Sequence, residues 1–437
     1  MEQFRQSIKG QKERAILVGA ILKRGKVGDD LAELSALAQS ADVHVVDRFQ
    51  QKLNSILPAT YIGKGKAEEL AERVIQYEAD VVIFDNNLSP AQIRELERIL
   101  KVKVLDRSEL ILDIFATRAQ TRQARLQVEL AQLEYTYPRL TRMWSHLDTI
   151  AGGGGGSGAG SVGGIGTRGP GEKQLEIDRR LVNNRISELK SELKEIDKRK
   201  LREISGRNKL FKVGLVGYTN AGKSTLLNIL TDSDVYVKDQ LFATLDTRTR
   251  KWCPERGLEV LVSDTVGFVR NLPHQLVASF KATLEEAVHA DLLLHVVDVS
   301  NSEVLDQVEA VNQVLKEIGC NRKPTIMVLN KSDVILTTGP LDLLQTLHPD
   351  SITISAKSGM GLTALSEVIC DRFRGRELHL KVKCSQADGK TQSFLRAQGH
   401  IMEETYLDNG VCFEVVLGRN QLPNLKRLNP EDIEIVA

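Results

Sequence analysis

The stretch Gly217-Tyr218-Thr219-Asn220-Ala221-Gly222-Lys223-Ser224 fits the pattern G-x-x-x-x-G-K-S of phosphate-binding loops. An apolar run at 213–216 precedes it, and Thr225 with a mostly apolar run to residue 230 follows, so strand, loop and helix come in the required order. Glycines permit the backbone angles that point successive N–H groups at phosphate oxygens. Lys223 adds a positive charge for the β- and γ-phosphates, and the Ser224 hydroxyl is a ligand for Mg²⁺. These flanks make a chance glycine turn the weaker interpretation.

Three further motifs follow in the order of a guanine-nucleotide-binding domain, each at the end of a strand-like run. Residues 260–263 lead into Asp264-Thr265-Val266-Gly267, in which Asp264 can reach the metal through water and the Gly267 amide can face the γ-phosphate. Residues 325–329 lead into Asn330-Lys331-Ser332-Asp333, and residues 351–354 lead into Ser355-Ala356-Lys357. Each motif alone is weak, but four in this order predict a domain that binds GTP and GDP with Mg²⁺.

The expected base specificity rests on Asp333, whose carboxylate can accept hydrogen bonds from both guanine N1–H and the 2-amino group. Adenine offers neither donor there, and a site built for paired hydrogen bonds rejects an analogue that leaves its carboxylate unpaired. The Lys331 stem can cover the base, and the Ala356 amide can donate to guanine O6. We therefore expect nucleotide contacts from all four motifs.

Composition narrows the class of protein. A chain of 437 residues has room for two to four domains, and a formal net charge of +1 does not exclude a nucleic-acid partner where charge is unevenly distributed. The five cysteines lack a C-x-x-C pattern, which favours reduced thiols in a cytoplasmic protein. The eight histidines lack metal-ligand spacing. The start lacks a secretory apolar segment, and no run of about 18 apolar residues occurs. We expect a soluble monomer that is neither secreted nor active at a membrane.

Residues 1–106 alternate between strand-like and helical runs, which predicts an N-terminal parallel α/β domain. Strands are predicted at 15–22, 43–49, 81–84 and 102–105, and helices at 31–37, 65–76 and 90–100. Gly63-Lys64-Gly65-Lys66 resembles a phosphate loop, but we favour a basic turn before the helix. Whether this domain binds a second nucleotide such as ATP is left open.

Residues 107–210 carry two apolar seams at helical spacing, which predict a long antiparallel helical hairpin. The seams are Leu126, Leu130, Leu133, Tyr137 and Leu140, and Val182, Ile186, Leu189, Leu193 and Ile196. Arginines such as Arg139 and Arg142 surround the first seam, and an arginine-rich helix suits a phosphate backbone as well as solvent. The glycine-rich loop 151–171 joins the helices. Because a hairpin needs only a few connecting residues, we favour a contact role for this loop over an inert tether.

The guanine-nucleotide domain is expected at 211–374 and a small α+β domain at 375–437. In the latter, strands are predicted at 378–384, 393–396 and 412–417, with a helix from Pro423. The expected fold class is therefore α/β: a parallel N-terminal domain, a helical hairpin, a Ras-like P-loop GTPase domain and a small α+β domain.

Several motifs together resemble the HflX family of translational GTPases. They are Tyr61-Ile62-Gly63-Lys64-Gly65-Lys66, Leu88-Ser89-Pro90-Ala91-Gln92, Leu110-Ile111-Leu112-Asp113-Ile114-Phe115, Leu126-Gln127-Val128-Glu129-Leu130-Ala131-Gln132-Leu133, Arg168-Gly169-Pro170-Gly171-Glu172-Lys173-Gln174-Leu175-Glu176, the stretch from Gly217 to Thr225, Leu241-Phe242-Ala243-Thr244-Leu245-Asp246, and Asp264-Thr265-Val266-Gly267-Phe268. The resemblance implies binding to the large ribosomal subunit and the splitting of stalled or idle ribosomes. It also implies that the glycine loop and the hairpin enter ribosomal RNA near the peptidyl transferase centre. The glycine run is longer than the family's pattern, and Thr247 stands where proline often follows the Asp246 position.

The expected catalytic residues are Lys223, Thr244 and Gly267. Thr244 is expected to close over Mg²⁺ and the γ-phosphate, with Thr247 as the alternative. Phe268 stands where many small GTPases have a glutamine that orients the attacking water, which a phenyl ring cannot do. We therefore expect slow intrinsic hydrolysis, with the missing element supplied by a partner, a reordered loop or K⁺. Asn220 resembles the asparagine that coordinates K⁺ in some related GTPases.

Three alternatives remain open. A GTPase for RNA modification or ribosome assembly shares the nucleotide domain but not the hairpin motifs. A membrane-acting GTPase needs an amphipathic or lipidated segment, and none is evident. A nucleotide-gated RNA-binding scaffold differs only in its low turnover.

Overall fold

The computed structural model describes residues 12–22, 31–143, 170–206, 211–231, 242, 248–255, 258–270, 286–335, 339–374, 377–407, 410–418 and 421–436. Contacts divide the chain into two compact units, one of Met1–Trp252 and Val260–Ser351, the other of Cys253–Glu259 and Ile352–Ala437. The four-domain division expected from the sequence remains a prediction.

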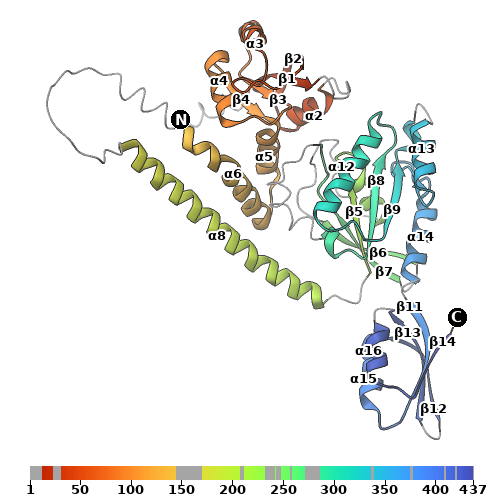
Figure 1. The fold of residues 1–437 in the computed structure, drawn as a ribbon. Coiled ribbons are helices and arrows are strands. Elements are labelled where there is room, and N and C mark those ends of the chain that lie inside the picture. The colour runs from red at the N-terminus through yellow and green to blue at the C-terminus, as the bar shows by residue number, and fades with distance from the viewer. Residues whose placement is uncertain are drawn as a thin grey trace, which may run out of the picture. The chain divides into compact units, whose positions relative to one another are not determined.

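The N-terminal segment forms a parallel sheet covered by helices on both faces (Figure 1). Its elements are β1 (Arg14–Leu22), α2 (Ala32–Ser40), β2 (His44–Leu53), α3 (Lys64–Gln76), β3 (Val81–Phe84), α4 (Pro90–Leu100), β4 (Lys103–Asp106) and α5 (Arg107–Arg118). The strand order is β2-β1-β3-β4, and every pair is parallel, as the alternation of strand and helix predicted. Leu70 and Leu96 cover one face, and Leu34 and Ile111 cover the other. Helix α5 shares this core, although the expected boundary at residue 106 falls just before it.

The Gly63-Lys64-Gly65-Lys66 turn has the geometry of an ordinary helix start. Gly63 is the N-cap of α3 with φ −60°, an angle open to any residue, and its N–H donates to Gln51 Oε1 at 3.1 Å. A Cβ added at Gly65 would meet no atom within 4 Å. Lys66 pairs with Glu69 one turn later. These contacts favour the basic-turn interpretation.

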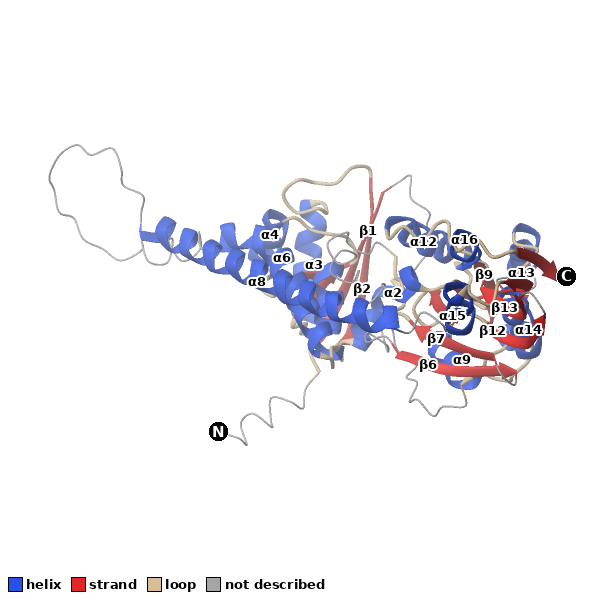
Figure 2. Ribbon diagram, turned by 90° about the horizontal axis from the view of Figure 1, so that it is seen from below, coloured by secondary structure: helices blue, strands red, loops and turns tan. Residues whose placement is uncertain are grey.

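Helices α6 (Arg122–Met143) and α8 (Pro170–Gly206) lie side by side as the predicted hairpin (Figure 1 and Figure 2). Leu126 and Leu130 pack against Leu189 and Leu193 along the predicted seams. The pairing of Arg122 with Glu192 and, later on α6, of Glu129 with Arg185 shows that the helices run antiparallel.

The segment that carries the phosphate loop contains a second sheet, whose central strands are parallel, and the helices that connect them. Its elements are β5 (Phe211–Gly217), α9 (Lys223–Leu230), β6 (Arg248–Glu255), β7 (Leu258–Asp264), β8 (Leu292–Asp298), α12 (Val304–Glu317), β9 (Thr325–Asn330), the 3-10 helix η1 (Ser332–Val334) and α13 (Gly339–Leu347). Strands β9, β8, β5 and β7 are neighbours in that order and run parallel. Their carboxyl ends therefore meet at one edge, where α/β sheets bind ligands.

The second unit contains β10 (Ile352–Thr353), α14 (Leu362–Arg374), β11 (Glu377–Cys384), α15 (Gly389–Gln398), β12 (His400–Leu407), β13 (Gly410–Gly418), α16 (Leu422–Arg427) and β14 (Asp432–Val436). Strands β12-β13-β11-β14 form an antiparallel sheet. The predicted strand at 393–396 is wrong, because these residues lie in α15. Asp388 caps that helix by accepting from Thr391 N–H, and Leu395 is buried against the sheet. The strands at 378–384 and 412–417 are confirmed, and the sequence analysis missed β12 and β14.

Candidate nucleotide-binding site

Two glycines shape the phosphate loop between β5 and α9. Gly217 has φ +152°, and a Cβ there would lie 2.2 Å from Val296 O. Gly222 is the N-cap of α9 with φ +93°, and a Cβ there would lie 2.3 Å from Asn330 Nδ2. Both contacts are too close for any side chain, so the loop can take this path only with glycine at these positions.

Lys223 opens α9 and is buried beneath the loop. Its Nζ donates hydrogen bonds to Gly217 O at 3.1 Å and to Tyr218 O at 2.7 Å. Burial lowers the pKa of Lys223 to about 8, and the nearby Asp264 carboxylate opposes this shift. Both acceptors are neutral carbonyl oxygens, which anionic phosphate oxygens can replace with a gain in electrostatic energy.

Ser224 and Asp264 bring two oxygen ligands together at the same edge. Ser224 Oγ donates to Asp264 Oδ2 at 2.6 Å, and Asp264 is fully buried at the end of β7. Next to it, Thr265 Oγ1 donates to Leu215 O and ties β7 to β5. In the ranges that the structure describes, no three His, Cys, Asp or Glu side chains gather as a metal cage. A hydroxyl beside a carboxylate fits Mg²⁺, which takes oxygen ligands and completes its shell with substrate phosphates and water.

Gly267 and Phe268 are joined directly to the phosphate loop. Thr219 N–H donates to Phe268 O at 2.8 Å, and Phe268 N–H donates to Gly217 O at 3.1 Å. A Cβ at Gly267 would lie 2.7 Å from Thr219 Cγ2 and 3.1 Å from Lys223 Nζ. The Phe268 ring is buried in the core near Val266 and therefore offers no polar group at this position.

The third motif also reaches the loop. Asn330 is buried, and its Nδ2 donates to Ala221 O at 2.8 Å. Lys331 has φ +65°, and its Nζ pairs with Asp298 at 2.7 Å. Asp333 lies exposed in η1 beside Ser332.

The fourth motif lies in the second unit and is described there by itself. Ser355 and Ala356 are buried in a tight loop, in which Ser355 N–H donates to Met360 O at 3.0 Å and Gly359 N–H donates to Ser355 O at 2.9 Å. Lys357 is exposed on the same loop.

Several expected residues lie outside the described part of the chain. They are Thr244, Thr247, Arg168, the side chain of Arg142 and the glycine loop up to residue 169. Asn220 is described, with φ +60° and an exposed side chain. Phe242 is also described, and its ring meets Phe115 of α5 edge-on at a centroid distance of 4.5 Å.

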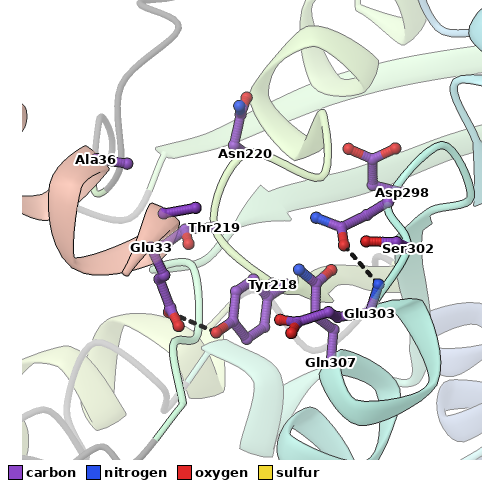
Figure 3. A pocket seen from close by; sticks show the side chains of 11 residues that line it. Glu33, Ala36, Tyr218, Thr219, Asn220, Asp298, Ser302, Glu303 and Gln307 are labelled. Carbon is purple, nitrogen blue, oxygen red and sulfur yellow. Dashed lines mark hydrogen bonds between the residues drawn. The ribbon is translucent and has the colours of Figure 1, made fainter. Parts of the chain in front are cut away.

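A cluster of charged residues joins the phosphate loop to α2, and the sequence analysis did not anticipate it. Tyr218 OH donates to Glu33, as Figure 3 shows, and accepts from Arg270 N–H at 2.8 Å. Glu33 also pairs with Arg270 Nε at 2.9 Å and Arg107 Nη2 at 2.8 Å. Arg107 is almost fully buried and pairs with Asp85 as well. Burial and the Glu33 carboxylate both raise the pKa of the Tyr218 hydroxyl, so it stays protonated. A pocket of about 400 Å³ lies beside this cluster.

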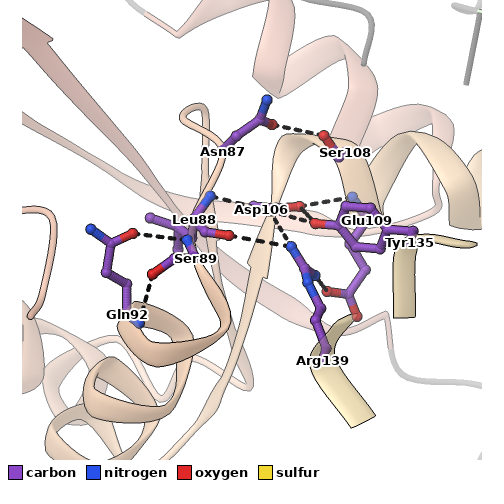
Figure 4. Close-up of polar contacts among 9 residues, drawn as sticks. All are labelled: Asn87, Leu88, Ser89, Gln92, Asp106, Ser108, Glu109, Tyr135 and Arg139. Atoms are coloured by element: carbon purple, nitrogen blue, oxygen red, sulfur yellow. Dashed lines mark hydrogen bonds and ion pairs between the residues drawn. The ribbon is translucent and has the colours of Figure 1, made fainter. Parts of the chain in front are cut away.

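A second cluster fixes the base of the hairpin (Figure 4). Fully buried Asp106, the N-cap of α5, accepts from Glu109 N–H at 2.9 Å, Leu88 N–H at 3.2 Å and Tyr135 OH. Arg139 Nη2 donates to Asp106 at 2.9 Å, and the guanidinium lies 3.6 Å from the Tyr135 ring centroid. Arg139 also contacts Glu109 at 3.4 Å. The expectation that Arg139 is available to RNA phosphates is therefore wrong.

In the described ranges, no helix combines the length and the apolar character that crossing a bilayer requires.

Three family models match successive parts of the chain. Residues 28–116 match the model described as GTP-binding GTPase N-terminal, residues 118–207 the GTP-binding GTPase Middle Region, and residues 212–331 the 50S ribosome-binding GTPase.

Curated relatives cover nearly the whole chain. The GTPase HflX of Caldanaerobacter subterraneus is 43% identical over 92% of this chain and 90% of its own length. The GTPase HflX of Escherichia coli K12 is 42% identical over 92% of this chain and 93% of its own length. A solved complex of SsGBP with GDP covers 82% of this chain and 98% of its own at 27% identity, with a TM-score of 0.47.

Proposed function

Since the chain belongs to the HflX family of GTPases, we propose that this GTPase binds the large ribosomal subunit in the cytoplasm and splits stalled or idle ribosomes. GTP hydrolysis then resets the protein. The observation that carries the proposal is a series of mostly buried polar contacts that runs from the phosphate loop to Arg107 of α5, next to Asp106 at the base of the hairpin.

The path has three steps. Tyr218 of the phosphate loop bonds to Glu33 of α2, and Glu33 pairs with buried Arg107 of α5. The residue before Arg107 is Asp106, which holds Tyr135 and Arg139 of α6. Charges this deeply buried resist separation, since an unpaired one is costly. A displacement of the phosphate loop on nucleotide binding is therefore expected to move α5 and the hairpin together.

The nucleotide chemistry follows from the residues of the site. Mg²⁺, held by Ser224 with Asp264 through water and closed over by Thr244, would neutralise charge that develops on the phosphates. Lys223 would leave its carbonyl acceptors for the β- and γ-phosphates, and Gly267 N–H would face the γ-phosphate. Asn220 is the candidate ligand for K⁺.

The hairpin and the glycine loop 151–171 are the proposed contact with ribosomal RNA near the peptidyl transferase centre. A phosphate-contacting surface makes affinity fall steeply as salt rises. A short turn in place of residues 152–166 should leave GTP affinity unchanged and lower the rate of splitting. Splitting at the normal rate by this variant would reduce the loop to a tether.

The path is tested with Tyr218→Phe and Glu33→Gln, singly and together. Each single variant should retain GTP affinity and lose most GTP-stimulated splitting, measured by light scattering. The double variant should be no worse than either, because both break the same link. Tyr406→Phe, at an exposed tyrosine of the second unit, is the matched control. Additive losses in the double variant would refute a shared path.

The subunit preference separates this function from a role in ribosome assembly or RNA modification. Co-sedimentation with a GTP analogue should recover the protein with large subunits, and GDP should weaken that binding. Retention on small subunits instead would favour the assembly role. Ribosome-stimulated turnover would exclude a scaffold that hydrolyses little.

Guanine specificity is proposed to rest on Asp333. Asp333→Asn should weaken GTP binding and admit xanthine nucleotides, because the 2-oxo group of xanthine can accept from the new amide. A titration in which the variant still strongly prefers GTP over XTP would show this assignment to be wrong.

A further inference from the structure

Hydrolysis of GTP requires a group that orients the attacking water, and Phe268 does not provide one. Its ring is buried, and two backbone hydrogen bonds to Gly217 and Thr219 hold it in place. Within the chain, a polar group for this task therefore has to come from a residue other than Phe268 that lies near Gly267.

Thr219 is the phosphate-loop residue closest to a Cβ built on Gly267. A Cβ built on Gly267 points at Thr219 Cγ2, 2.7 Å away, and at Lys223 Nζ, 3.1 Å away. Thr219, Gly267 and Lys223 therefore converge on one point of the phosphate cradle. Since Lys223 and the Gly267 amide are the expected γ-phosphate ligands, this point is the γ-phosphate end of the loop.

The Thr219 hydroxyl is buried and has no hydrogen-bond partner among the residues that the structure describes. Leaving a buried hydroxyl unpaired is unfavourable. An unpaired hydroxyl in the phosphate loop therefore indicates that its partner is the bound substrate or its attacking water. Tyr218, the preceding residue, has its hydroxyl fully engaged by Glu33 and Arg270. Thr219 is thus left with a hydroxyl for which the described residues supply no partner.

We infer that the Thr219 hydroxyl is a catalytic group that replaces the missing glutamine. It accepts a hydrogen bond from the attacking water and donates its own to a γ-phosphate oxygen. The water oxygen forms the new bond to the γ-phosphorus, while the bond from phosphorus to the β,γ-bridging oxygen breaks and GDP leaves. The proton lost by the water ends on the released phosphate, so Thr219 neither gains nor loses one.

The test uses the full chain with ribosomes and compares Thr219→Val with Thr219→Ser. Valine keeps the branched shape and removes the hydroxyl, whereas serine keeps the hydroxyl and removes the methyl group. Thr219→Val should lower single-turnover GTP hydrolysis at least about tenfold, as loss of one transition-state hydrogen bond does. Its affinity for GDP should change less than about twofold, because GDP has no γ-phosphate for the hydroxyl to contact, and its affinity for GTP should fall by much less than the rate. Thr219→Ser should recover most of the rate.

Two further readouts separate catalysis from structure. The unaltered chain should form a tight complex of GDP with aluminium fluoride, followed by the fluorescence of a labelled GDP, and Thr219→Val should fail to form it. Its melting temperature without nucleotide should not fall, since the hydroxyl makes no hydrogen bond to any described residue. Thr346→Val, at a hydroxyl on α13 that bonds only to Asp342 O in the described residues, is the control. Hydrolysis by Thr219→Val at the normal rate would overturn the inference. So would a loss fully explained by weaker binding or by a lower melting temperature.

Discussion

The phosphate loop and the base of the hairpin each shield a basic side chain from solvent, but they hold it differently: Lys223 is buried and the Arg139 side chain is 15% exposed. Lys223 donates to the neutral carbonyl oxygens of Gly217 and Tyr218, whereas Arg139 donates to the carboxylates of Asp106 and Glu109. A carbonyl loses little when an anion takes the lysine. Taking Arg139 away would leave the fully buried Asp106 carboxylate without its cation. A buried basic residue is therefore available to an anionic ligand only where its present acceptors are neutral.

The largest effect on stability is expected from Arg139→Ala. Stranding buried Asp106 should lower the free energy of unfolding by about 3–5 kcal/mol, measured by urea denaturation. Arg122→Ala removes an ion pair on the same helix in which Arg122 is 82% exposed, so it should change stability by only about 0–1 kcal/mol. Equal changes in the two variants would show that the carboxylates do not hold Arg139 in place.

Lys223→Ala should act on binding instead. Losing a buried charge from the phosphate site should lower the affinity for GTP about 100-fold, or roughly 3 kcal/mol of binding free energy. A fluorescence titration measures this affinity. Without nucleotide, the free energy of unfolding should change by less than about 1 kcal/mol, because only hydrogen bonds to carbonyls are lost. If the variant without nucleotide were as unstable as Arg139→Ala, the contrast between the two sites would fail.

Glu109→Gln should change how the free energy of unfolding depends on pH, because Glu109 lies in the shielded cluster at the base of the hairpin. Burial raises the pKa of Glu109 to about 7, and Asp106 adds to the shift. The folded carboxyl therefore holds its proton more tightly than the unfolded one, so stability from this group is lost as pH rises from about 4.5 to 7. Glutamine has no proton to lose, so the variant should gain about 1–3 kcal/mol over the unaltered chain at pH 8 and little at pH 4.5. Urea unfolding at both pH values measures this, and an identical gain at both would contradict it.

The smallest expected effect is the uptake of a fraction of a proton by Lys223 when nucleotide binds. Because burial lowers its pKa to about 8, the lysine is partly neutral at that pH. Phosphate charge favours the protonated form, so nucleotide binding should take up about half a proton at pH 8 and almost none at pH 6. Calorimetry in buffers of different ionisation enthalpy measures this uptake. No uptake at pH 8 would mean that Lys223 stays fully charged before nucleotide binds.

The sequence predicted those parts of the site that are contiguous in the chain. Gly217 to Ser224, Asp264 to Gly267 and Asn330 to Asp333 each specify a local turn after a buried strand, and parallel pairing brings three of these ends together. The helical hairpin was predictable for a similar reason, since a seam at helical spacing is visible within one segment.

Contacts between distant residues were not predictable in this way. Arg139 looked available because no acid lies close to it on α6, yet its partner Asp106 precedes it by 33 residues. Glu33 and Tyr218 carry no shared pattern, and only folding brings them together. At 393–396, the pair Phe394-Leu395 suggested a strand. The spacing of buried Thr391 and Leu395 by four residues was the helical signal that the prediction overlooked.

The sequence separation of the Glu33 contacts has a consequence for how the chain is made. The sheet of β1 to β4 uses only residues 14–106, whereas Glu33 meets Tyr218 across 185 positions and Arg270 across 237. Domains fold from the N-terminus during synthesis, so the sheet is expected to close long before its charged partners emerge. Nascent chains long enough for residue 120 to have left the ribosome should resist protease in this sheet, and only chains that have exposed Arg270 should protect α2. A newly made molecule is therefore expected to complete the link between nucleotide and hairpin only after Arg270 has emerged, well after its N-terminal sheet has formed.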